Sequence, residues 1–437
     1  MSIELITVLL FGSFLLLMVT GVPLVFSLGG SAVIGTYFLW GPDALYAVGI
    51  RTFSSATSFV LLAIPMFIFM GAMLERSGIA SDLYAMMQKW LGAVRGGLAV
   101  GTVLVCTIFA ALVGVSGAAT VTMGLVALPS MLNHNYDKGI SLGCIAAGGA
   151  LGVLIPPSVL MIVLGLYTNT SVGMLFMGGI TAGLVLVTLF TTYILVVSAI
   201  WPHLGPAVPK HERASFPEKL TALRSVILPI MLVVVVLGSI IAGVATPSEA
   251  AGLGAFGAMI CAFVRRRLTW PTVYEACKIT LRLSCMVMWI VFAAAIFTSL
   301  YAAVGADQLV RDSLSLLPGG RWGVLIGMQV IWIIMGCFLD PIGIMILTAP
   351  LFFPIATQLG FDPVWLGVLF VVNMEMAFLT PPFGFNLFYL RSVAPPNVTM
   401  ADIYRSVGPF VALQALALGL MMIFPGLITW LPYTLMR

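Results

Sequence analysis

Two stretches of the chain place hydroxyl groups, glycines and one acid inside otherwise apolar sequence. The first, GVSGAATVTMG, spans 114–124, and the second, GCFLDPIGIMILTAP, spans 336–350 and contains Asp340. Glycine lets backbone carbonyls turn inward, and hard cations such as Na⁺ prefer oxygen ligands. An aspartate at the centre of a membrane helix costs about 2.5–3.5 kcal/mol on insertion scales, which disfavours a filler role for Asp340. Both stretches are therefore candidate ion-binding turns.

Each half of the chain also contains two adjacent prolines within an apolar stretch. These are GALGVLIPPS, from Gly149 to Ser158, and NMEMAFLTPPFGFNLF, from Asn373 to Phe388. Proline removes a backbone N–H and clashes with the preceding turn, so we expect the helix to break at both places. In lipid, a broken helix is tolerated only where the freed carbonyls face protein, water or an ion. Breaks at matching positions of two halves indicate the binding site of a secondary transporter.

We expect each turn to face the break of its own half, giving about two Na⁺ sites for a transported coupling ion. Many of the ligands would be main-chain carbonyls. The first site is expected to use Ser116, Gly117, Thr120, Pro156, Pro157 and Ser158. The second is expected to use Asp340, Gly343, Thr380, Pro381, Pro382 and Gly384.

The half-helices at the breaks predict a site for an organic anion. Their N-terminal ends carry positive partial charge and unpaired N–H groups, which suit a carboxylate or sulfonate. The hydrogen-bonding candidates for the substrate are Thr122, Ser158 and Asn386. We expect no Lys or Arg in the central cavity and therefore no direct salt bridge to the substrate.

Simpler interpretations stay open beside these. A proline pair in a membrane helix can be a mere kink, and the SGAAT run can be a close contact between helices. Glu375 is either a proton site or part of a polar seam. The six cysteines show no CxxC spacing, which disfavours a disulfide or metal framework, and no histidine is placed as a catalytic group.

Composition settles the class of the chain. Of its 437 residues, 61% are hydrophobic and 8% are charged, and the mean hydropathy is +1.16. Soluble domains carry about 25% charged residues, so this is an all-α polytopic membrane protein. The first apolar segment has Glu4 in place of a basic start and no small-residue cleavage site, which predicts a membrane helix and not a signal peptide. Apolar segments long enough to cross a bilayer cover 4–20, 24–40, 56–75, 174–200, 225–243, 247–264, 283–303 and 406–430.

The two halves resemble each other. Gly21 and Gly243, and likewise Gly114 and Gly336, are 222 positions apart, and the proline pairs are 225 apart. Such a shared offset predicts an internal repeat. The first repeat is expected at 1–200, a cytoplasmic linker at 201–224 and the second repeat at 225–437. We expect re-entrant hairpins at 98–132 and 323–355, and broken helices at 140–168 and 364–390.

The positive charges give an orientation. With about five crossings and one re-entrant hairpin per half, and with the N-terminus outside, fifteen of the 19 Lys and Arg residues fall on one side. That side is expected to be cytoplasmic. Because five is odd, the second half would be inserted upside down, which makes an inverted-topology repeat.

The chain resembles the large membrane subunit, DctM-type, of the tripartite ATP-independent periplasmic (TRAP) transporters. The matching stretches are LLAIPMFIFMGAMLERSGI, GVSGAATVTMG, GALGVLIPPS, GVATPSEAAGLGAFGA, CFLDPIGIMILTAPLFFP and FLTPPFGFNLFYLRSVAP. The resemblance implies a bacterial or archaeal inner-membrane permease without enzymatic activity. It also implies a small four-helix membrane subunit, a periplasmic substrate-binding protein, Na⁺ coupling and an elevator motion of hairpins and broken helices against outer helices.

One departure from the family bears on the substrate. The sialic-acid branch has a serine-rich run containing aspartate after GVSG, where this chain has Ala118 to Thr122. This favours small organic anions such as dicarboxylates, 2-oxo acids or hydroxy acids. The alternatives are a self-contained Na⁺/carboxylate symporter, an intramembrane enzyme using Asp340 and Glu375, and a scaffold that transports nothing. The enzyme is disfavoured because no nucleophile or metal set accompanies the two acids.

Overall fold

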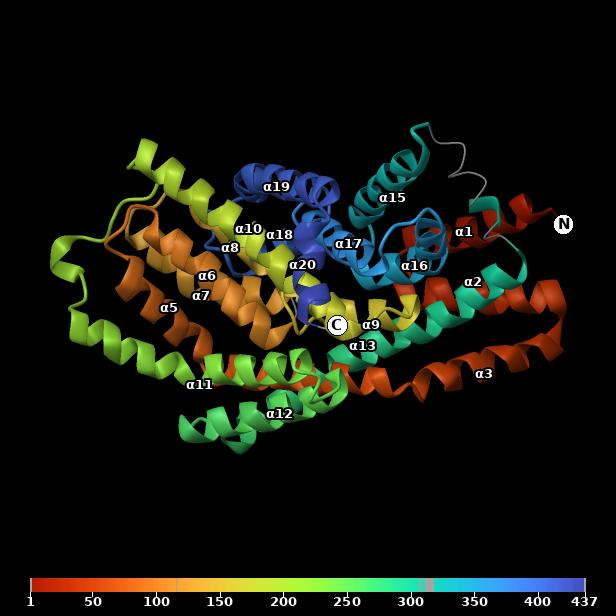
Figure 1. Ribbon diagram of the computed structural model, residues 1–437, viewed down its shortest axis with the longest axis horizontal. Coiled ribbons are helices and arrows are strands. Elements are labelled where there is room, and N and C mark those ends of the chain that lie inside the picture. Colours follow the sequence, from red (N-terminus) through yellow and green to blue (C-terminus); the bar gives the residue numbers. More distant parts are fainter. Residues whose placement is uncertain (1, 115, 306–307, 311–317, 436–437) are drawn as a thin grey trace.

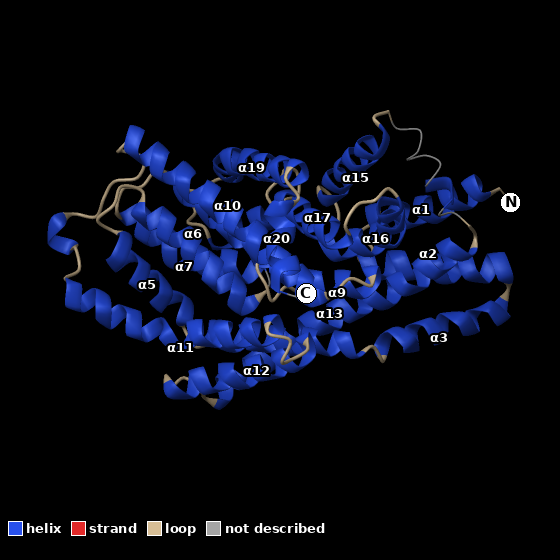
Figure 2. Cartoon of the chain, in the orientation of Figure 1, coloured by secondary structure: helices blue, strands red, loops and turns tan. Residues whose placement is uncertain are grey.

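The chain folds entirely into helices where it is described. The computed structural model describes residues 2–114, 116–305, 308–310 and 318–435, and within these ranges there is no strand (Figures 1 and 2). Six of the described helices are long and apolar enough to cross a membrane: Phe59–Arg76, Val172–Ile200, Pro247–Val264, Trp270–Ala303, Pro341–Gln358 and Met400–Ile423. The protein is therefore a multi-pass membrane protein, as its composition predicts.

The outer helices follow the predicted apolar segments. In the first half they are α1 (Ile3–Val19), α2 (Leu24–Trp40), α3 (Leu45–Ala56), α4 (Ala63–Arg76), α5 (Ile79–Leu91) and α10 (Val172–Ile200). In the second half they are α11 (Phe216–Ile241), α12 (Pro247–Val264), α13 (Trp270–Ala303), α19 (Met400–Ile423) and α20 (Gly426–Leu435). The hydropathy segments did not include α3. The single segment expected at 406–430 is wrong, because α19 ends at Ile423 and Pro425 cannot continue a helix interior.

A pair of consecutive helices occupies each of the two stretches expected as hairpins. The first stretch contains α6 (Gly97–Val113) and α7 (Ser116–Asn133), which meet at Gly114. The second contains α15 (Gly320–Gly336) and α16 (Pro341–Gln358), joined through a short turn that ends at Asp340. The turn between the two helices of a pair is called its tip. The polar tip residues, Ser116 in the first pair and Asp340 in the second, lie at the start of the second helix.

Both proline pairs lie in non-helical backbone. In the first half, α8 (Lys138–Ala150) and a 3₁₀ turn (Leu151–Val153) precede the pair, and α9 (Val159–Thr168) follows it. In the second half, α17 (Pro363–Ala377) precedes the pair and α18 (Phe385–Val393) follows it. The bonds Pro156–Pro157 and Pro381–Pro382 are both cis.

The two halves pack into each other. Helix α18 packs on α7, α19 on α8, α16 on α9, and α12 on α4, so each contact joins the second half to the first. In Figure 1, α11 and α12 lie along one long edge of the molecule, whereas α9, α17 and α18 lie near its middle. Helix α13 packs on α2, α3 and α4. The broken helices are therefore placed centrally, with outer helices beside them.

The segment between the halves is anchored to the first half. Backbone hydrogen bonds join Gly96 N to Gly205 O (2.8 Å), Asp137 N to Leu204 O (3.0 Å) and Val208 N to Gly92 O (2.8 Å). The linker is expected at 201–224, but it ends earlier in the structure, because α11 already begins at Phe216 with a capping box. The connecting residues are thus a fixed part of the fold.

Candidate ion and substrate site

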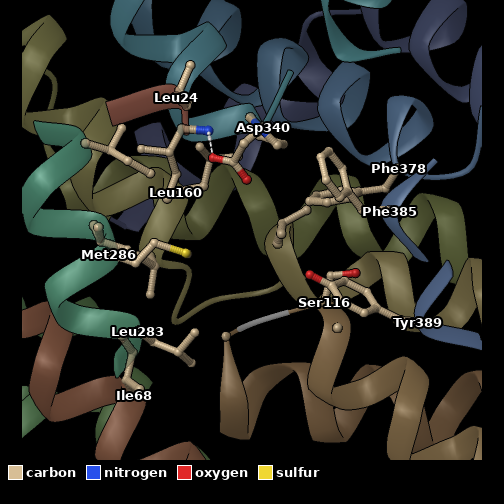
Figure 3. Close-up of a pocket in the computed structure, with 18 of the residues that line it drawn as sticks. Leu24, Ile68, Ser116, Leu160, Leu283, Met286, Asp340, Phe378, Phe385 and Tyr389 are labelled. Atoms are coloured by element: carbon tan, nitrogen blue, oxygen red, sulfur yellow. Dashed lines mark hydrogen bonds between the residues drawn. The ribbon is translucent and has the colours of Figure 1, made fainter. Parts of the chain in front are cut away.

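One cavity of about 410 Å³ lies beside both helix-pair tips and is lined by residues that flank both breaks, whereas neither proline pair is among its described lining residues. Its inner wall comes from the two tips, the residues that flank the two breaks and α18, and its outer wall from α2, α4 and α13 (Figure 3). Such a volume lies within the range of small-molecule pockets, about 300–1,000 Å³. The inner wall contributes Gly114, Ser116, Gly117, Val153, Val159, Leu160, Asp340, Pro341, Ile342, Phe378, Phe385 and Tyr389, and the outer wall Pro23, Leu24, Val25, Ile68, Leu283, Met286, Val287 and Ile290.

Four helices begin at this cavity. The first residues of α7, α9, α16 and α18 are Ser116, Val159, Pro341 and Phe385, and all four line it. A helix N-terminus carries roughly half a positive charge and unpaired N–H groups. Among the described lining residues there is no Lys or Arg, and there is one acid, Asp340. The four helix starts therefore bring partial positive charge to a cavity that also contains a carboxyl group.

The first tip rests against the first break. Gly114 has a φ of +66°, and a Cβ added to it would lie 2.2 Å from Pro157 O. The Ser158 hydroxyl donates to Val153 O at 2.5 Å across the break and accepts Met161 N at 3.4 Å. Ser158 thus closes the break and caps α9 at the same time.

Two further residues of the first predicted site, Gly117 and Thr120, lie on α7. Thr120 donates its hydroxyl to Ser116 O (3.2 Å) and packs on Gly149, where an added Cβ would lie 2.0 Å from Thr120 Oγ1. Gly117 faces the ring of Tyr389, whose Cε2 would be 2.8 Å from an added Cβ. The tip, the break and α8 are therefore in direct contact.

The second predicted site is arranged differently around its tip. Asp340 is the N-cap of α16, and its Oδ2 accepts Ile342 N at 3.0 Å, while the side chain lines the cavity (Figure 3). Gly343 faces the outer wall, because an added Cβ would lie 2.6 Å from Leu24 Cδ2. Asp340 therefore serves both the helix start and the cavity, whereas Gly343 approaches α2 closely.

The second break has internal partners of its own. Thr380 donates its hydroxyl to Met376 O (2.8 Å), and Tyr404 of α19 donates its hydroxyl to Pro382 O (3.0 Å). Gly384 has a φ of +31°, and an added Cβ would lie 3.2 Å from Thr380 O. The Pro382 carbonyl of this break is thus hydrogen-bonded to Tyr404 of α19, and the Thr380 carbonyl oxygen lies beside Gly384.

The three residues expected to bind substrate lie behind the cavity wall or away from it. Asn386 is fully buried and is bound by Ser116 and Ala146, and Ser158 is buried in the first break. Thr122 lies deeper along α7, where its hydroxyl donates to Glu75 Oε1 of α4 at 3.4 Å. None of the three is among the described residues that line the cavity.

Ser116 of the first predicted Na⁺ site is hydrogen-bonded to Asn386, one of the residues predicted to bind substrate. Ser116 Oγ donates to Asn386 Oδ1 (2.6 Å), and Asn386 Nδ2 donates to Ala146 O of α8 (3.2 Å). The first tip, the second break and the first broken helix are therefore tied together by one amide. Hydrogen bonds between buried groups are costly to lose, since an unsatisfied partner remains.

Tyr389 is a lining residue that the sequence analysis missed. It lies four residues after Phe385 on α18, and both side chains line the cavity. Residues i and i+4 share one face of a helix, so the helical period of FNLFYL would have grouped them. In Figure 3, Tyr389 lies next to Ser116, on the side of the cavity away from Asp340.

The donor chemistry around the cavity consists of hydroxyls, backbone carbonyls and one carboxylate. In the described part of the chain, no group of three or more His, Cys, Asp and Glu side chains could hold a metal ion. Oxygen donors of this kind suit a hard monovalent cation better than a transition metal.

The fold itself is that of known membrane transporters. The structure superposes on the YdaH transporter of Alcanivorax borkumensis with a TM-score of 0.64 at 16% sequence identity, over 89% of this chain and 90% of that one. This likeness gives the fold class, which is a polytopic helical membrane protein.

The sequence comparisons give the family. The family described as "Tripartite ATP-independent periplasmic transporter, DctM component" matches residues 11–427. The C4-dicarboxylate TRAP transporter large permease protein DctM of Vibrio cholerae is 33% identical, over 100% of this chain and 98% of its own. Its counterpart in Pseudomonas aeruginosa is 34% identical, over 93% of this chain and 92% of its own. The chain belongs to the DctM family of TRAP transporter large permeases, and its function is transport rather than catalysis.

Proposed function

We propose that this chain is the large permease subunit of a Na⁺-coupled transporter that imports a small organic anion by an elevator mechanism. The observation that carries the proposal is the cavity lined by both tips and by residues that flank both breaks, among them the first residues of four helices. In this arrangement, an anion and a cation can bind next to each other. Coupling between them follows from their mutual attraction.

Two Na⁺ positions are proposed, one at each contact of tip and break. The first uses Ser116, Gly117, Thr120 and the carbonyls of Pro156, Pro157 and Ser158. The second uses Asp340, Gly343, Thr380, Pro381, Pro382 and Gly384. The close approach of Gly114 to Pro157 O supports the first, and the position of the Asp340 carboxyl at the cavity supports the second.

The anion is proposed to bind at the helix ends, close to Ser158 and Asn386, with Thr122 farther along α7. Helix N-termini bind carboxylates without a basic side chain. The two DctM relatives are named as C4-dicarboxylate permeases, and a dicarboxylate, 2-oxo acid or hydroxy acid fits a cavity of about 410 Å³. The binding-protein partner would make the final selection among these acids.

An elevator motion is supported by the difference between the two cavity walls. The inner wall carries the polar groups and belongs to tips and breaks, whereas the outer wall from α2, α4 and α13 is apolar. Apolar helix faces form few directional bonds, so the inner elements can slide along them. Inverted repeats of 1–200 and 225–437 would supply the two equivalent end states.

The partners follow from the family. We propose a small four-helix membrane subunit beside this chain, a periplasmic binding protein that delivers the anion, and a location in the inner membrane of the cell.

The test is uptake into proteoliposomes containing this chain and a small membrane subunit of the same transporter. Uptake of a radiolabelled C4-dicarboxylate should require an inward Na⁺ gradient together with a periplasmic binding protein of that transporter. A proton gradient replacing the Na⁺ gradient is the control. Uptake at the full rate without the binding protein would favour a self-contained Na⁺/carboxylate symporter, and uptake indifferent to Na⁺ would refute the coupling.

A further inference from the structure

A buried carboxyl of α17 has only one partner. Glu375 has no exposed surface, and its Oε1 accepts Nε2 of Gln414 of α19 at 3.1 Å. Its other oxygen, Oε2, is buried without a hydrogen-bond partner, and so is Oε1 of Gln414. The two unsatisfied atoms thus belong to the same pair of side chains.

One proton on Glu375 gives both unpaired oxygens, Glu375 Oε2 and Gln414 Oε1, a hydrogen bond. If Glu375 is ionised, a carboxylate oxygen and an amide oxygen are both buried without donors, which is strongly unfavourable in a low-dielectric interior. If Oε2 carries a proton, that O–H donates to Gln414 Oε1 while the amide N–H donates to Glu375 Oε1. The acid and the amide then form a ring closed by two hydrogen bonds.

No described charge compensates a carboxylate at this position. Helix α17 packs against α9, α10, α15, α16, α19, α20 and the 3₁₀ turn Leu151–Val153. The titratable or charged side chains that these elements carry are Tyr167, Tyr193, Arg321, Asp402, Tyr404, Arg405 and Tyr433. None of the described ion pairs of the protein includes Glu375.

Both arginines of this set are placed away from the pair. Arg321 lies over the rings of Trp322 and Phe361, at 5.8 and 5.7 Å from their centroids. Arg405 precedes Gln414 by nine residues, which is roughly 13 Å along a helix. Neither guanidinium is therefore a counter-ion for Glu375.

The fold does not itself demand an acid at this place. Six residues before the proline pair, the second half has Glu375, whereas the first half has Ala150 at the corresponding place in α8. On the opposite side of α17, Asn373 makes a comparable link to α15 with a neutral amide, since its Nδ2 donates to Gln329 Oε1 at 2.7 Å.

We propose that Glu375 is a resident proton-binding site, which means that its carboxyl group keeps one proton on Oε2. This O–H group donates a hydrogen bond to Oε1 of Gln414. The neutral pair joins α17 to α19 one to two turns before the second break. It also keeps a second negative charge away from the cavity that contains Asp340. This site is additional to the proposed Na⁺ and anion sites, and the proton stays bound through the transport cycle.

The first test is infrared spectroscopy of the purified protein in lipid at neutral pH. A protonated carboxyl has a C=O stretching band separate from that of a carboxylate. We expect this band to lose intensity in Glu375→Gln and to keep it in the matched controls Asp340→Asn and Glu75→Gln. An unchanged band in Glu375→Gln would overturn the proposal, whatever the outcome of transport assays.

The second test compares thermal unfolding of paired variants. Glu375→Gln should unfold at the wild-type temperature, because its amide can form the same two-bond ring with Gln414. Gln414→Leu should lower the unfolding temperature, and adding Glu375→Leu to it should recover part of the loss, because no buried partner is then left alone. A Glu375→Gln variant as unstable as Glu375→Leu would contradict the neutral pair.

The third test asks whether the proton leaves. With a resident proton, Glu375→Gln keeps Na⁺-driven uptake and its pH dependence. A folded Glu375→Gln protein that has lost uptake would overturn the resident site, since the proton would then have to exchange during transport.

Discussion

The hydroxyl of Ser116 donates a 2.6 Å hydrogen bond to the side-chain oxygen of Asn386, 270 residues further along the chain. Ser116 begins α7 at the first tip, and Asn386 lies in the first turn of α18 after the second break. This bond links Ser116 of the first proposed Na⁺ position to a residue two positions after Gly384 of the second. We therefore expect an ion at the first position to influence the start of α18.

Removing that hydroxyl should weaken both stability and ion coupling. In Ser116→Ala, Asn386 Oδ1 loses the one donor that it has among the described residues, and leaving such a buried acceptor unsatisfied costs about 1–3 kcal/mol. We expect a lower unfolding temperature and a higher Na⁺ concentration for half-maximal uptake. Ser392→Ala is the matched control, since the exposed Ser392 hydroxyl of α18 bonds only Tyr389 O. Equal behaviour of the two variants would show that the link has no role in coupling.

The charge of Asp340 should matter beyond its role as a helix cap. Asparagine caps a helix about as well as aspartate, so Asp340→Asn keeps the cap of α16 and removes the negative charge. We expect the Na⁺ concentration for half-maximal uptake to rise by about tenfold, which corresponds to roughly 1.4 kcal/mol. Asp137→Asn, at the N-cap of α8, is the control. If both variants keep wild-type Na⁺ dependence, Asp340 is only a cap.

Gly114 should not tolerate a side chain. Its positive φ costs an L-residue about 1–2 kcal/mol, and a Cβ would also collide with Pro157 O. Gly78→Ala separates these effects, because Gly78 has a φ of +75° with nothing within 4 Å of an added Cβ. Gly114→Ala should lose more stability than Gly78→Ala and should abolish Na⁺-dependent uptake. A Gly114→Ala protein that transports as well as Gly78→Ala would disprove the close contact of tip and break.

Filling the cavity from its outer wall should block transport without unfolding the protein. Met286 and Leu281 of α13 both have exposed side chains, but Met286 lines the cavity and Leu281 lies outside the lining. We expect Met286→Trp to reduce uptake to near background while its unfolding temperature stays close to that of Leu281→Trp. Substrate uptake and thermal unfolding, measured on the same preparations, check this. Normal uptake by Met286→Trp would place the substrate path elsewhere.

The sequence by itself determined the membrane class, the positions of most spanning helices and the non-helical backbone at both proline pairs. These features depend on local properties: the hydropathy of a segment and the steric demands of proline act within a few residues. The motifs also sufficed to place the chain in its family. The Na⁺ and substrate residues remain predictions, although the structure brings Ser116, Asp340 and residues that flank both breaks to one cavity.

Only the tertiary structure decided which groups meet. Helix packing turned Gly343 toward Leu24, placed Tyr404 on Pro382 O, brought Tyr389 over Gly117 and paired Ser116 with Asn386. It also directed four helix N-termini at the same cavity and enclosed Glu375 with Gln414. These relationships join residues far apart in the chain, so they depend on the angles and heights at which helices cross, which no local pattern specifies.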